Sequence, residues 1–575
     1  MRSAQQPQRK GAEFFSAPVG SVHRRYEALR AYLLEGASAV EVASRFGITV
    51  STVAAMVRDF RAGDTTFFVD RHPGPRRAPS KEAARDEVLR LRQQGRSITE
   101  ITRALTEGQT PLNHTGVWQI LRQEGYERLA QRPPAERGAL RREHPPRTRV
   151  LEWPDAPVRF TTDFAGVMLL VPGLVELDLV GAVAQAQFPG TQEIPALSSV
   201  LSLLALKAIG RRRVSHVDDV AVDPALGAFA GLTCLPKATA LGTYSYRLSR
   251  GHDQDLLAAL GRTLKSSGRT TGAEFDLDFH AIMHCGDDVA LETHYVPRRS
   301  QRTESVLTFF AQDGISRNLV YANASCTKAG QAGEALAFAR HWEAATGSLP
   351  ELLVFDSKVT TGAGLAAIDA AGMRFLTLRQ RNPALTSRLE SLPDQDWTTV
   401  TLDRRGPYSR PQVHEDVVTV RGCSRSLRQI AVRGLGHDHP TLILTNDIAS
   451  PPGMLVNRYA KRMAIEQRLA EAIRSFHLDA LSSAVALNVD LDTTLTVWAQ
   501  AAYDTVRSRL GGYETATPDT IWRRFISTRG EITLGPEEVV VRLASRTYSP
   551  VMRSAHHPVV AVPWWGDRPL RFEFA

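Results

Sequence analysis

The stretch from Leu455 to His477, LVNRYAKRMAIEQRLAEAIRSFH, constrains this chain more than any other. Its apolar residues recur at helical spacing and no Gly or Pro interrupts it, so it predicts one long helix. Because each helical residue turns the chain by about 100°, Tyr459, Arg462 and Glu466 share one face within about 60°. A phenol, a guanidinium and a carboxylate on one face suit a metal ion and a phosphate. An exposed Arg462–Glu466 pair, four residues apart, explains the same face equally well.

The composition limits the classes of protein that remain. The chain has 575 residues and a formal net charge of +9, which predicts several domains and an anionic partner. No apolar run approaches the ~20 residues of a membrane span, and the N-terminal MRSAQQPQRKGAEFF has no apolar signal core. We therefore expect a cytoplasmic protein with no membrane partner. The cysteines are isolated from one another, which argues against a zinc site or a disulfide framework; they are Cys234, Cys285, Cys326 and Cys423.

Residues 1–70 carry two short helical patterns around a turn, AVEVASRFGITVSTVAAMVRDF. Gly47 supplies the break, and Ser51 or Thr52 can cap the second helix. The pattern resembles a helix-turn-helix, in which the second helix lies in the major groove of DNA. Ser51 and Thr52 are therefore candidate DNA contacts, and an ordinary helical hairpin is the alternative.

Residues 80–130 repeat this theme with three expected helices, the last over Asn113–Tyr126. Thr115 and Trp118 sit at the start of that last helix, where base edges or phosphates are usually met, and are candidate DNA contacts. Two such units in tandem could span a long DNA site.

The segment 131–157 is rich in Pro and Arg at its start and is expected to be a basic linker. Its arginines are candidate phosphate contacts, namely Arg141, Arg142, Arg147 and Arg149. A solvated tether without DNA contacts explains the same composition.

Residues 273–382 are expected to form a mixed sheet. EFDLDFHAI alternates apolar residues with Asp276, Asp278 and His280, which predicts a strand with an acidic face. Two further strands, a helix, the short apolar strand ELLVFDS with Asp356 near its end, a helix and a last strand follow. This is the order of elements in the ribonuclease H-like fold, in which the first and fourth strands are neighbours. We therefore expect Asp278 and Asp356 to lie side by side.

The rest of the chain predicts a helical subdomain over 158–272, a β-rich insertion over 383–447, a return to the core over 448–512, and a tail with strands over 513–575. A buried helix is expected over 198–210. The predicted fold is therefore a multidomain α+β protein with tandem N-terminal helix-turn-helix units and a ribonuclease H-like α/β core that an insertion interrupts.

Asp278, Asp356 and Glu466 have a common explanation as ligands of two metal ions. Two-metal chemistry places the ions about 4 Å apart and needs one bridging carboxylate with further carboxylates for each ion. Mg²⁺ prefers hard oxygen ligands and keeps waters and phosphate oxygens, so three carboxylates suffice. We expect two Mg²⁺ ions, with Mn²⁺ able to substitute, and Asp278 as the bridge. Asp276 and Asp163 are the alternatives for the first aspartate.

The separations of the three carboxylates are 78 residues (356 − 278 = 78) and 110 residues (466 − 356 = 110), and the second fits an insertion. With this spacing the chain resembles a DDE transposase of a bacterial insertion sequence, from the branch with a β-strand insertion before the final glutamate. That branch carries a Tyr-x2-Arg-x3-Glu-x6-Lys signature, matched at Tyr459, Arg462 and Glu466. Ile473 stands where the lysine belongs, and Arg474 is next to it. LDFH and FDSKVTT also look like the two aspartate motifs of this family.

The resemblance covers roughly residues 158–575 and implies metal-dependent cleavage and strand transfer of double-stranded DNA. Its implied partners are element ends and target DNA, bound by a homodimer or a larger assembly in the bacterial nucleoid. Tyr459, Arg462, Arg474 and Lys358 are then candidate DNA contacts. A transposase-derived DNA-binding protein without catalysis, and a nuclease that cuts without joining, are the alternatives.

Overall fold

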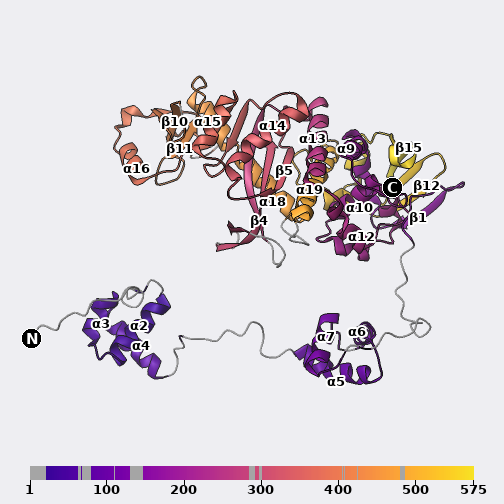
Figure 1. The fold of residues 1–575 in the computed structure, drawn as a ribbon, viewed down its shortest axis with the longest axis horizontal. Helices are drawn as coiled ribbons and strands as arrows, with labels where there is room; N and C mark the ends of the chain where they lie inside the picture. The colour runs from indigo at the N-terminus through magenta and orange to yellow at the C-terminus, as the bar shows by residue number, and fades with distance from the viewer. Residues whose placement is uncertain are drawn as a thin grey trace, which may run out of the picture. The chain divides into compact units, whose positions relative to one another are not determined.

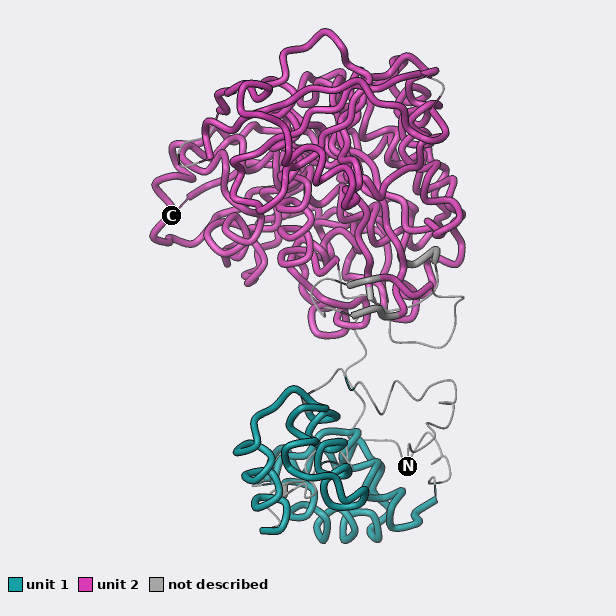
Figure 2. The backbone as a smooth tube through the Cα atoms, turned by 90° about the vertical axis from the view of Figure 1, so that its left-hand side faces the viewer, with its two compact units in different colours: residues 1–142 teal, residues 143–575 magenta. Residues whose placement is uncertain are grey.

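The computed structural model describes residues 21–62, 79–108, 110–127, 147–283, 292–296, 301–403, 408–423, 425–478 and 486–574, together with residues 18, 67, 129 and 406. Arg141, Arg142 and Cys285 lie outside these ranges. The chain divides into two compact units, Met1–Arg142 and Glu143–Ala575, which Figure 2 distinguishes by colour.

The first part of unit 1 is a three-helix cluster of α2 (Ser21–Leu33), α3 (Ala39–Phe46) and α4 (Val50–Arg61) (Figure 1). Its apolar core includes Val42, Phe46 and Val53. Gly47, at φ 64°, ends α3 in the left-handed conformation that glycine adopts without strain. The N-cap of α4 is Thr49, whose hydroxyl accepts a hydrogen bond from the Thr52 N–H. The expected cap at Ser51 or Thr52 is therefore wrong, because both residues already lie in the first turn.

The second part of unit 1 is another three-helix cluster, formed by α5 (Pro79–Gln93), α6 (Ile98–Glu107) and α7 (His114–Gln123). Buried Val88, Ile101 and Val117 join the helices. Asn113 caps α7 through its side-chain oxygen, which accepts from the Gly116 N–H. The expected number of helices in this segment is thus observed.

Unit 2 begins with a mainly helical segment. The expected buried helix over 198–210 is α10, in which every residue from Ser198 to Ala208 is buried. The elements of this segment are β1 (Val158–Thr162), η2 (Ala165–Leu170), α8 (Val171–Glu176), α9 (Leu179–Gln185), α10 (Ala196–Ala208), η3 (Val214–Asp219), α11 (Pro224–Phe229), α12 (Ala238–Gly242), η4 (Tyr244–Arg247) and α13 (Arg250–Ser266).

The strand β1 is the exception in this segment, because it pairs antiparallel with β12 near the C-terminus, with Phe160 opposite Ile532. The C-terminal sheet has the order β1-β12-β13-β15-β14. The elements of the C-terminal segment are α20 (Pro518–Ile521), the π-helix η8 (Trp522–Ile526), β12 (Gly530–Leu534), β13 (Val539–Leu543), α21 (Ser549–Ser554), β14 (Val560–Val562), η9 (Pro563–Trp565) and β15 (Arg568–Phe574). The tail over 513–575 therefore shares its sheet with the start of unit 2.

The large sheet of unit 2 has the strand order β5-β4-β2-β6-β7-β11-β10-β9-β8, and β3 also pairs with β4. β2 pairs antiparallel with β4 and parallel with β6, and β6 pairs parallel with β7. The strands are β2 (Glu274–Met283), β3 (Glu292–Val296), β4 (Gln301–Asp313), β5 (Leu319–Cys326), β6 (Leu352–Phe355), β7 (Arg374–Leu378), β8 (Thr398–Thr399), β9 (Gln412–Val418), β10 (Leu427–Arg433) and β11 (Thr441–Thr445).

Strand β2 presents two different faces because successive side chains of a strand alternate. Phe275 packs edge to face on Phe338 and Trp342 of α14 (Glu334–Thr346), with ring centroids 4.9 Å and 4.8 Å apart. Asp276 and Asp278 belong to the other set, and Asp276 meets Arg458 of α17 (Pro452–Ala460). The acidic face expected for this strand is therefore turned away from the aromatic core.

The insertion extends the large sheet, because β11 pairs antiparallel with β7. It also contains a helix that the sequence pattern did not predict, α16 (Pro383–Glu390), which the Asn382 side chain caps, and the 3₁₀ turn η7 (Asp394–Asp396). Ahead of the insertion, the core strands are connected by the 3₁₀ turn η6 (Gln331–Gly333) and by α15 (Gly362–Ala370). The first strand of the insertion, β8, is short and covers only Thr398–Thr399. The observed class is mixed α+β, with N-terminal helices followed by mixed sheets.

The stretch Leu455–His477 is not one helix. It divides into α17 (Pro452–Ala460) and α18 (Met463–Phe476), and α19 (Ala486–Arg507) follows. At the break the N–H groups of Arg462 and Ala464 bond to carbonyls only three residues back, each at 3.0 Å. The helical hydrogen-bond ladder is thus tightened there without any Gly or Pro.

No single helix among the described residues is long and apolar enough to cross a membrane; two bent pairs, Ala39–Phe46 with Val50–Arg61 and Ala165–Glu176 with Leu179–Gln185, satisfy length and composition only when taken together.

Candidate functional site

Two of the predicted carboxylates lie at one position of neighbouring parallel strands. In the β2–β6 register Leu277 is opposite Phe355, and the residue numbers of each pair differ by the same amount (355 − 277 = 78). Asp278 and Asp356 come next along the two chains, one residue beyond the last pair of this register. Asp356 follows the last residue of β6, so it lies at the carboxyl end of the strand, where loops leave the sheet.

Asp278 is largely buried, with its side chain 21% exposed. Its Oδ1 accepts a hydrogen bond from the Phe279 N–H at 2.9 Å. Burial raises the pKa of Asp278 to about 6; the positive charge of Arg462 opposes this shift, and the negative charges of Glu466 and Asp356 add to it. Asp278 is thus electrostatically coupled to both of the other predicted carboxylates.

Arg462 contacts two of the three carboxylates and is electrostatically coupled to the third, Asp356. Its side chain is only 10% exposed; Nη2 donates to Glu466 Oε1 at 2.8 Å, and Nη1 lies 3.7 Å from Asp278 Oδ2. Burial lowers the pKa of Arg462, but Tyr459 and the carboxylates of Asp278, Glu466 and Asp356 outweigh it and raise the pKa. The guanidinium therefore stands among the carboxylates that the sequence grouped as metal ligands.

The other two carboxylates are more accessible than Asp278. Glu466 is 47% exposed in the first turn of α18. Asp356 is half-buried, and its Oδ1 accepts from the Ser357 N–H at 2.6 Å. Both side chains can thus be reached from solvent while Arg462 beside them is buried.

The two alternatives for the first aspartate have other surroundings. Asp276 is buried and bonds Nη1 of Arg458 at 2.8 Å, and Nε of the same arginine bonds Glu274 at 2.6 Å. Asp163 is exposed and lines a pocket of about 640 Å³ beside the C-terminal sheet. Asp276 is therefore committed to an internal ion pair, and Asp163 belongs to a different sheet.

The donor set suits a hard divalent cation, because carboxylate oxygens are the ligands that Mg²⁺ prefers. Within the described ranges, however, no group of three or more His, Cys, Asp or Glu side chains is arranged to hold a metal ion. In the structure, the positive charge beside these carboxylates is the guanidinium of Arg462. The chemistry of the donors thus fits the expected ions, while their present arrangement surrounds a guanidinium.

The remaining residues of the signature region are less centrally placed. The Tyr459 hydroxyl is buried with no hydrogen-bond partner among the described residues, and burial raises the pKa of Tyr459 to about 12, against the opposing charge of Arg462. Ile473 is half-buried against the main apolar core, whereas Arg474 is exposed in the last turn of α18. Lys358 is exposed beyond β6.

The predicted DNA contacts in unit 1 are exposed at the starts of helices. Ser51 and Thr52 lie in the first turn of α4, and Thr115 and Trp118 lie in α7. Trp118 is 44% exposed, and the Arg122 guanidinium stacks over its ring at 5.1 Å. In the linker, Arg147 pairs with Glu193 and Arg149 lies 3.6 Å from Glu152.

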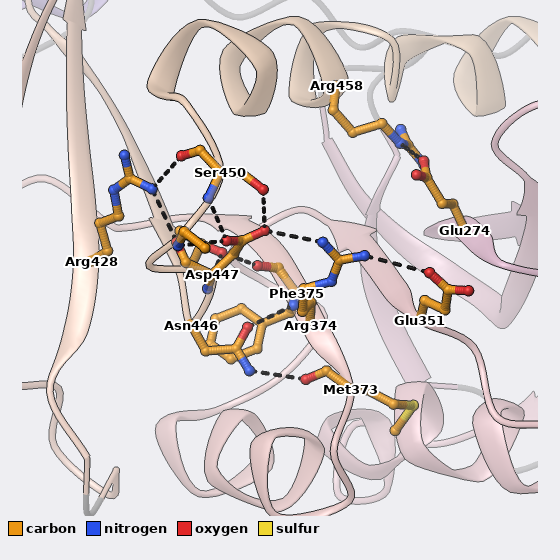
Figure 3. Close-up of polar contacts among 12 residues, drawn as sticks. Glu274, Glu351, Met373, Arg374, Phe375, Arg428, Asn446, Asp447, Ser450 and Arg458 are labelled. Atoms are coloured by element: carbon orange, nitrogen blue, oxygen red, sulfur yellow. Dashed lines mark hydrogen bonds and ion pairs between the residues drawn. The ribbon is translucent and has the colours of Figure 1, made fainter.

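A second polar region, which the sequence patterns did not predict, lies where β2, β6 and β7 begin, at the end of β6 opposite to the end with Asp356. Figure 3 shows the polar contacts of this region. Arg374 begins β7 and bonds Asp447 Oδ2 at 3.2 Å, and Asp447 also accepts from Ser450 Oγ at 2.7 Å. Nearby, a pocket of about 760 Å³ includes Arg458 and Lys461 in its lining. The only sequence signal for Arg458 is that it precedes Tyr459 on the same helix.

Neither a protein-family model nor a curated protein matches the chain. Among solved structures, the chain is similar to a cryo-EM structure of a piggyBac transposase synaptic complex with hairpin DNA. The identity is 12% and the TM-score 0.35, over 64% of this chain and 82% of that chain. Similarity at this level carries no conclusion about the activity of this chain.

Proposed function

We propose that this chain is a DDE-type DNA transposase with a ribonuclease H-like core. The observation that carries the proposal is the β2–β6 register, which makes Asp278 and Asp356 neighbours and leaves Glu466 joined to Asp278 through Arg462. The strand order β5-β4-β2-β6-β7, antiparallel on one side of β2 and parallel on the other, supports the core assignment.

In this proposal Asp278, Asp356 and Glu466 hold two Mg²⁺ or Mn²⁺ ions. Such ions, when bound, supply activation of a hydroxyl nucleophile and stabilisation of the leaving oxygen in phosphodiester chemistry. Asp278 is electrostatically coupled to both other carboxylates and is the candidate bridge. The reaction is cleavage at element ends, followed by strand transfer through the freed 3′-hydroxyl.

The DNA-binding roles are divided between the two units. Exposed residues at the starts of α4 and α7 would contact element ends, and the excess of positive charge in the whole chain favours the phosphate backbone. Lys358, Arg462 and Arg474 would meet phosphates near the carboxylates. Assembly as a homodimer or a larger complex on DNA belongs to the same proposal.

The first experiment substitutes each carboxylate by its neutral isostere: Asp278→Asn, Asp356→Asn and Glu466→Gln. Each should reduce Mg²⁺-dependent nicking of DNA that carries the sequences flanking the coding region by at least about a hundredfold (~2.7 kcal/mol). Fluorescence anisotropy should show unchanged binding to the same ends. The control Asp396→Asn, an exposed acid of the insertion, should cut normally.

Near-normal cleavage by any of the three variants removes that residue from the site. Asp276→Asn tests the alternative first aspartate. Asp276 pairs with Arg458 inside the protein, so its substitution should lower the melting temperature. The rate of cleavage per folded molecule should change little.

The second experiment deletes residues 1–142, which form unit 1. The truncated chain should lose discrimination between element ends and random duplex, because phosphate contacts alone carry no sequence information. Its residual binding should weaken steeply with salt. Full discrimination by the truncated chain would refute the assignment of unit 1.

A transposase-derived DNA-binding protein without catalysis is the second candidate, and two observations favour it. Asp278 and Glu466 pair with Arg462, the described carboxylates are not arranged to hold a metal ion, and Ile473 replaces the lysine of the signature. This candidate predicts specific end binding with no Mg²⁺-dependent or Mn²⁺-dependent nicking by the unaltered protein.

A further inference from the structure

We propose that Arg462 holds the place of a divalent cation among Asp278, Asp356 and Glu466 when no DNA is bound, so that metal loading is coupled to DNA binding through this side chain. The inference rests on the function proposed above and adds a regulatory step to it. The free protein would load metal weakly, and DNA would favour loading by drawing the guanidinium to a phosphate.

The first ground is the incomplete hydrogen bonding of Arg462. Although the side chain is nine-tenths buried, its Nε and Nη1 atoms have no hydrogen-bond partner among the described residues. Buried donors without partners are costly, at about 1–3 kcal/mol each. The guanidinium is therefore held by the charges around it and by the Tyr459 ring, whose centroid lies 5.9 Å from Cζ, and it keeps two donor atoms without a hydrogen bond.

An arginine inside α18, the helix whose N-cap is Arg462, shows the contrast. Arg468 is buried to a similar degree, but its Nε bonds the Arg317 carbonyl at 3.0 Å, Nη1 bonds Glu471 at 3.1 Å and Nη2 bonds Asp504 at 3.0 Å. All three nitrogen atoms of Arg468 thus have partners, as expected of a fixed structural ion pair. Arg462 lacks this arrangement and is the arginine free to change partner.

The second ground is electrostatic. Three carboxylates without a cation repel one another, and the single charge of Arg462 offsets part of that repulsion. A divalent ion bound by the same oxygen atoms would face the guanidinium at short range and be repelled by it. Metal and guanidinium therefore compete for the carboxylates.

DNA changes this competition because a phosphate offers the guanidinium two oxygen acceptors in the geometry that a planar fork of donors suits. Once Arg462 bonds a phosphate, its charge is neutralised and the carboxylates can accept metal. Linkage requires reciprocity: bound metal should raise DNA affinity by the same factor by which DNA raises metal affinity.

The test measures Mn²⁺ binding to the full chain without DNA by electron paramagnetic resonance. Arg462→Met should bind Mn²⁺ at least about tenfold more tightly than the unaltered protein, equivalent to ~1.4 kcal/mol. Arg462→Lys, which keeps the charge, should stay within about threefold of the unaltered protein, a change below ~0.7 kcal/mol. Lys461→Ala removes a charge from the neighbouring exposed residue and should leave the affinity unchanged. Thermal melts establish that each variant is folded.

Unchanged or weaker Mn²⁺ binding by folded Arg462→Met overturns the inference and leaves Arg462 as a positioning partner of Glu466. If Asp278→Asn abolishes Mn²⁺ binding in that case, the proposed metal site survives. An absence of Mn²⁺ binding in the unaltered protein and in every variant overturns both the proposed metal-dependent function and this inference. Tighter binding by both Arg462→Met and Lys461→Ala also overturns the inference, because net charge alone would explain it.

Discussion

Asp253 should make the stability of unit 2 depend on pH. It lies in the first turn of α13, is 1% exposed, and neither carboxylate oxygen has a hydrogen-bond partner among the described residues. Burial raises the pKa of Asp253 from 3.8 to about 8; the negative charge of Asp490 adds to this shift and Arg250 opposes it. The folded protein therefore keeps a proton on Asp253 at neutral pH.

The sign of the effect follows from proton binding in the two states. Between pH 3.8 and about pH 8 the unfolded chain has released the Asp253 proton and the folded chain retains it, so stability falls as pH rises. Each pH unit in this window costs about 1.4 kcal/mol. From pH 3.8 to pH 7 the loss is on the order of 4 kcal/mol.

The assay is urea denaturation of the full chain at pH 5, 6 and 7, with Asp253→Asn as the perturbation. The free energy of unfolding of the unaltered protein, minus that of Asp253→Asn, should fall by about 1.4 kcal/mol per pH unit. Any constant cost of placing an amide in this pocket cancels from that slope. Asp255→Asn, an exposed carboxylate two residues later, should leave the slope unaltered. Parallel pH profiles for the unaltered protein and Asp253→Asn would refute the reasoning.

A Cβ on Gly314 would lie 2.3 Å from Nη2 of Arg458, so Gly314→Ala should lower the thermal midpoint, with a loss of about 1–3 kcal/mol. A Cβ on Gly333 would have no heavy atom within 4 Å, so Gly333→Ala should leave the thermal midpoint unchanged. Equal losses of stability in the two variants would contradict the steric cause. Ser38→Ala removes the capping box of α3 and should reduce hydrogen-exchange protection of that helix by about 1 kcal/mol; unchanged protection would mean that packing alone fixes its start. Trp118→Ala should leave the melting temperature unchanged and weaken end binding at least about fivefold, or ~1 kcal/mol; unchanged affinity would remove Trp118 from the proposed interface.

Local patterns were sufficient for the strand that carries the first aspartate. Alternation along β2 assigns Phe275 and Leu277 to one face and Asp276 and Asp278 to the other, and the aromatic contacts of Phe275 agree with that division. The same pattern could not choose between the two aspartates, since both have the same parity. The choice depends on Arg458, which reaches Asp276 from a helix more than 170 residues later in the chain (458 − 276 = 182).

The break between α17 and α18 was outside the reach of sequence patterns. No Gly or Pro marks it, and apolar spacing continues through it. Two largely buried arginines close to the break pair with aspartates of β2: Arg458 of α17 with Asp276, and Arg462, the N-cap of α18, with Asp278. Both tertiary contacts lie at the break, and a local ladder of three-residue hydrogen bonds accommodates it. The pairing of β1 with β12 was missed for a related reason, because partners so far apart leave no local periodicity.

The number of residues between Asp278 and Asp356 also describes how β2 and β6 pair. Every residue pair of the parallel β2–β6 ladder has the same numerical offset as these two aspartates, so the ladder register brings them together. A slip of one residue would turn one of the two strands' side chains to the opposite face, and would bury Asp278 or Asp356 among apolar residues. The apolar face of β2 and the fully buried strand β6 therefore fix the register for reasons of packing, and the same packing fixes the pair of carboxylates. Glu466 lacks such a constraint: it reaches the pair only through the orientation of α18 and through Arg462, which makes it the member of the three whose position depends most on what occupies the space between them.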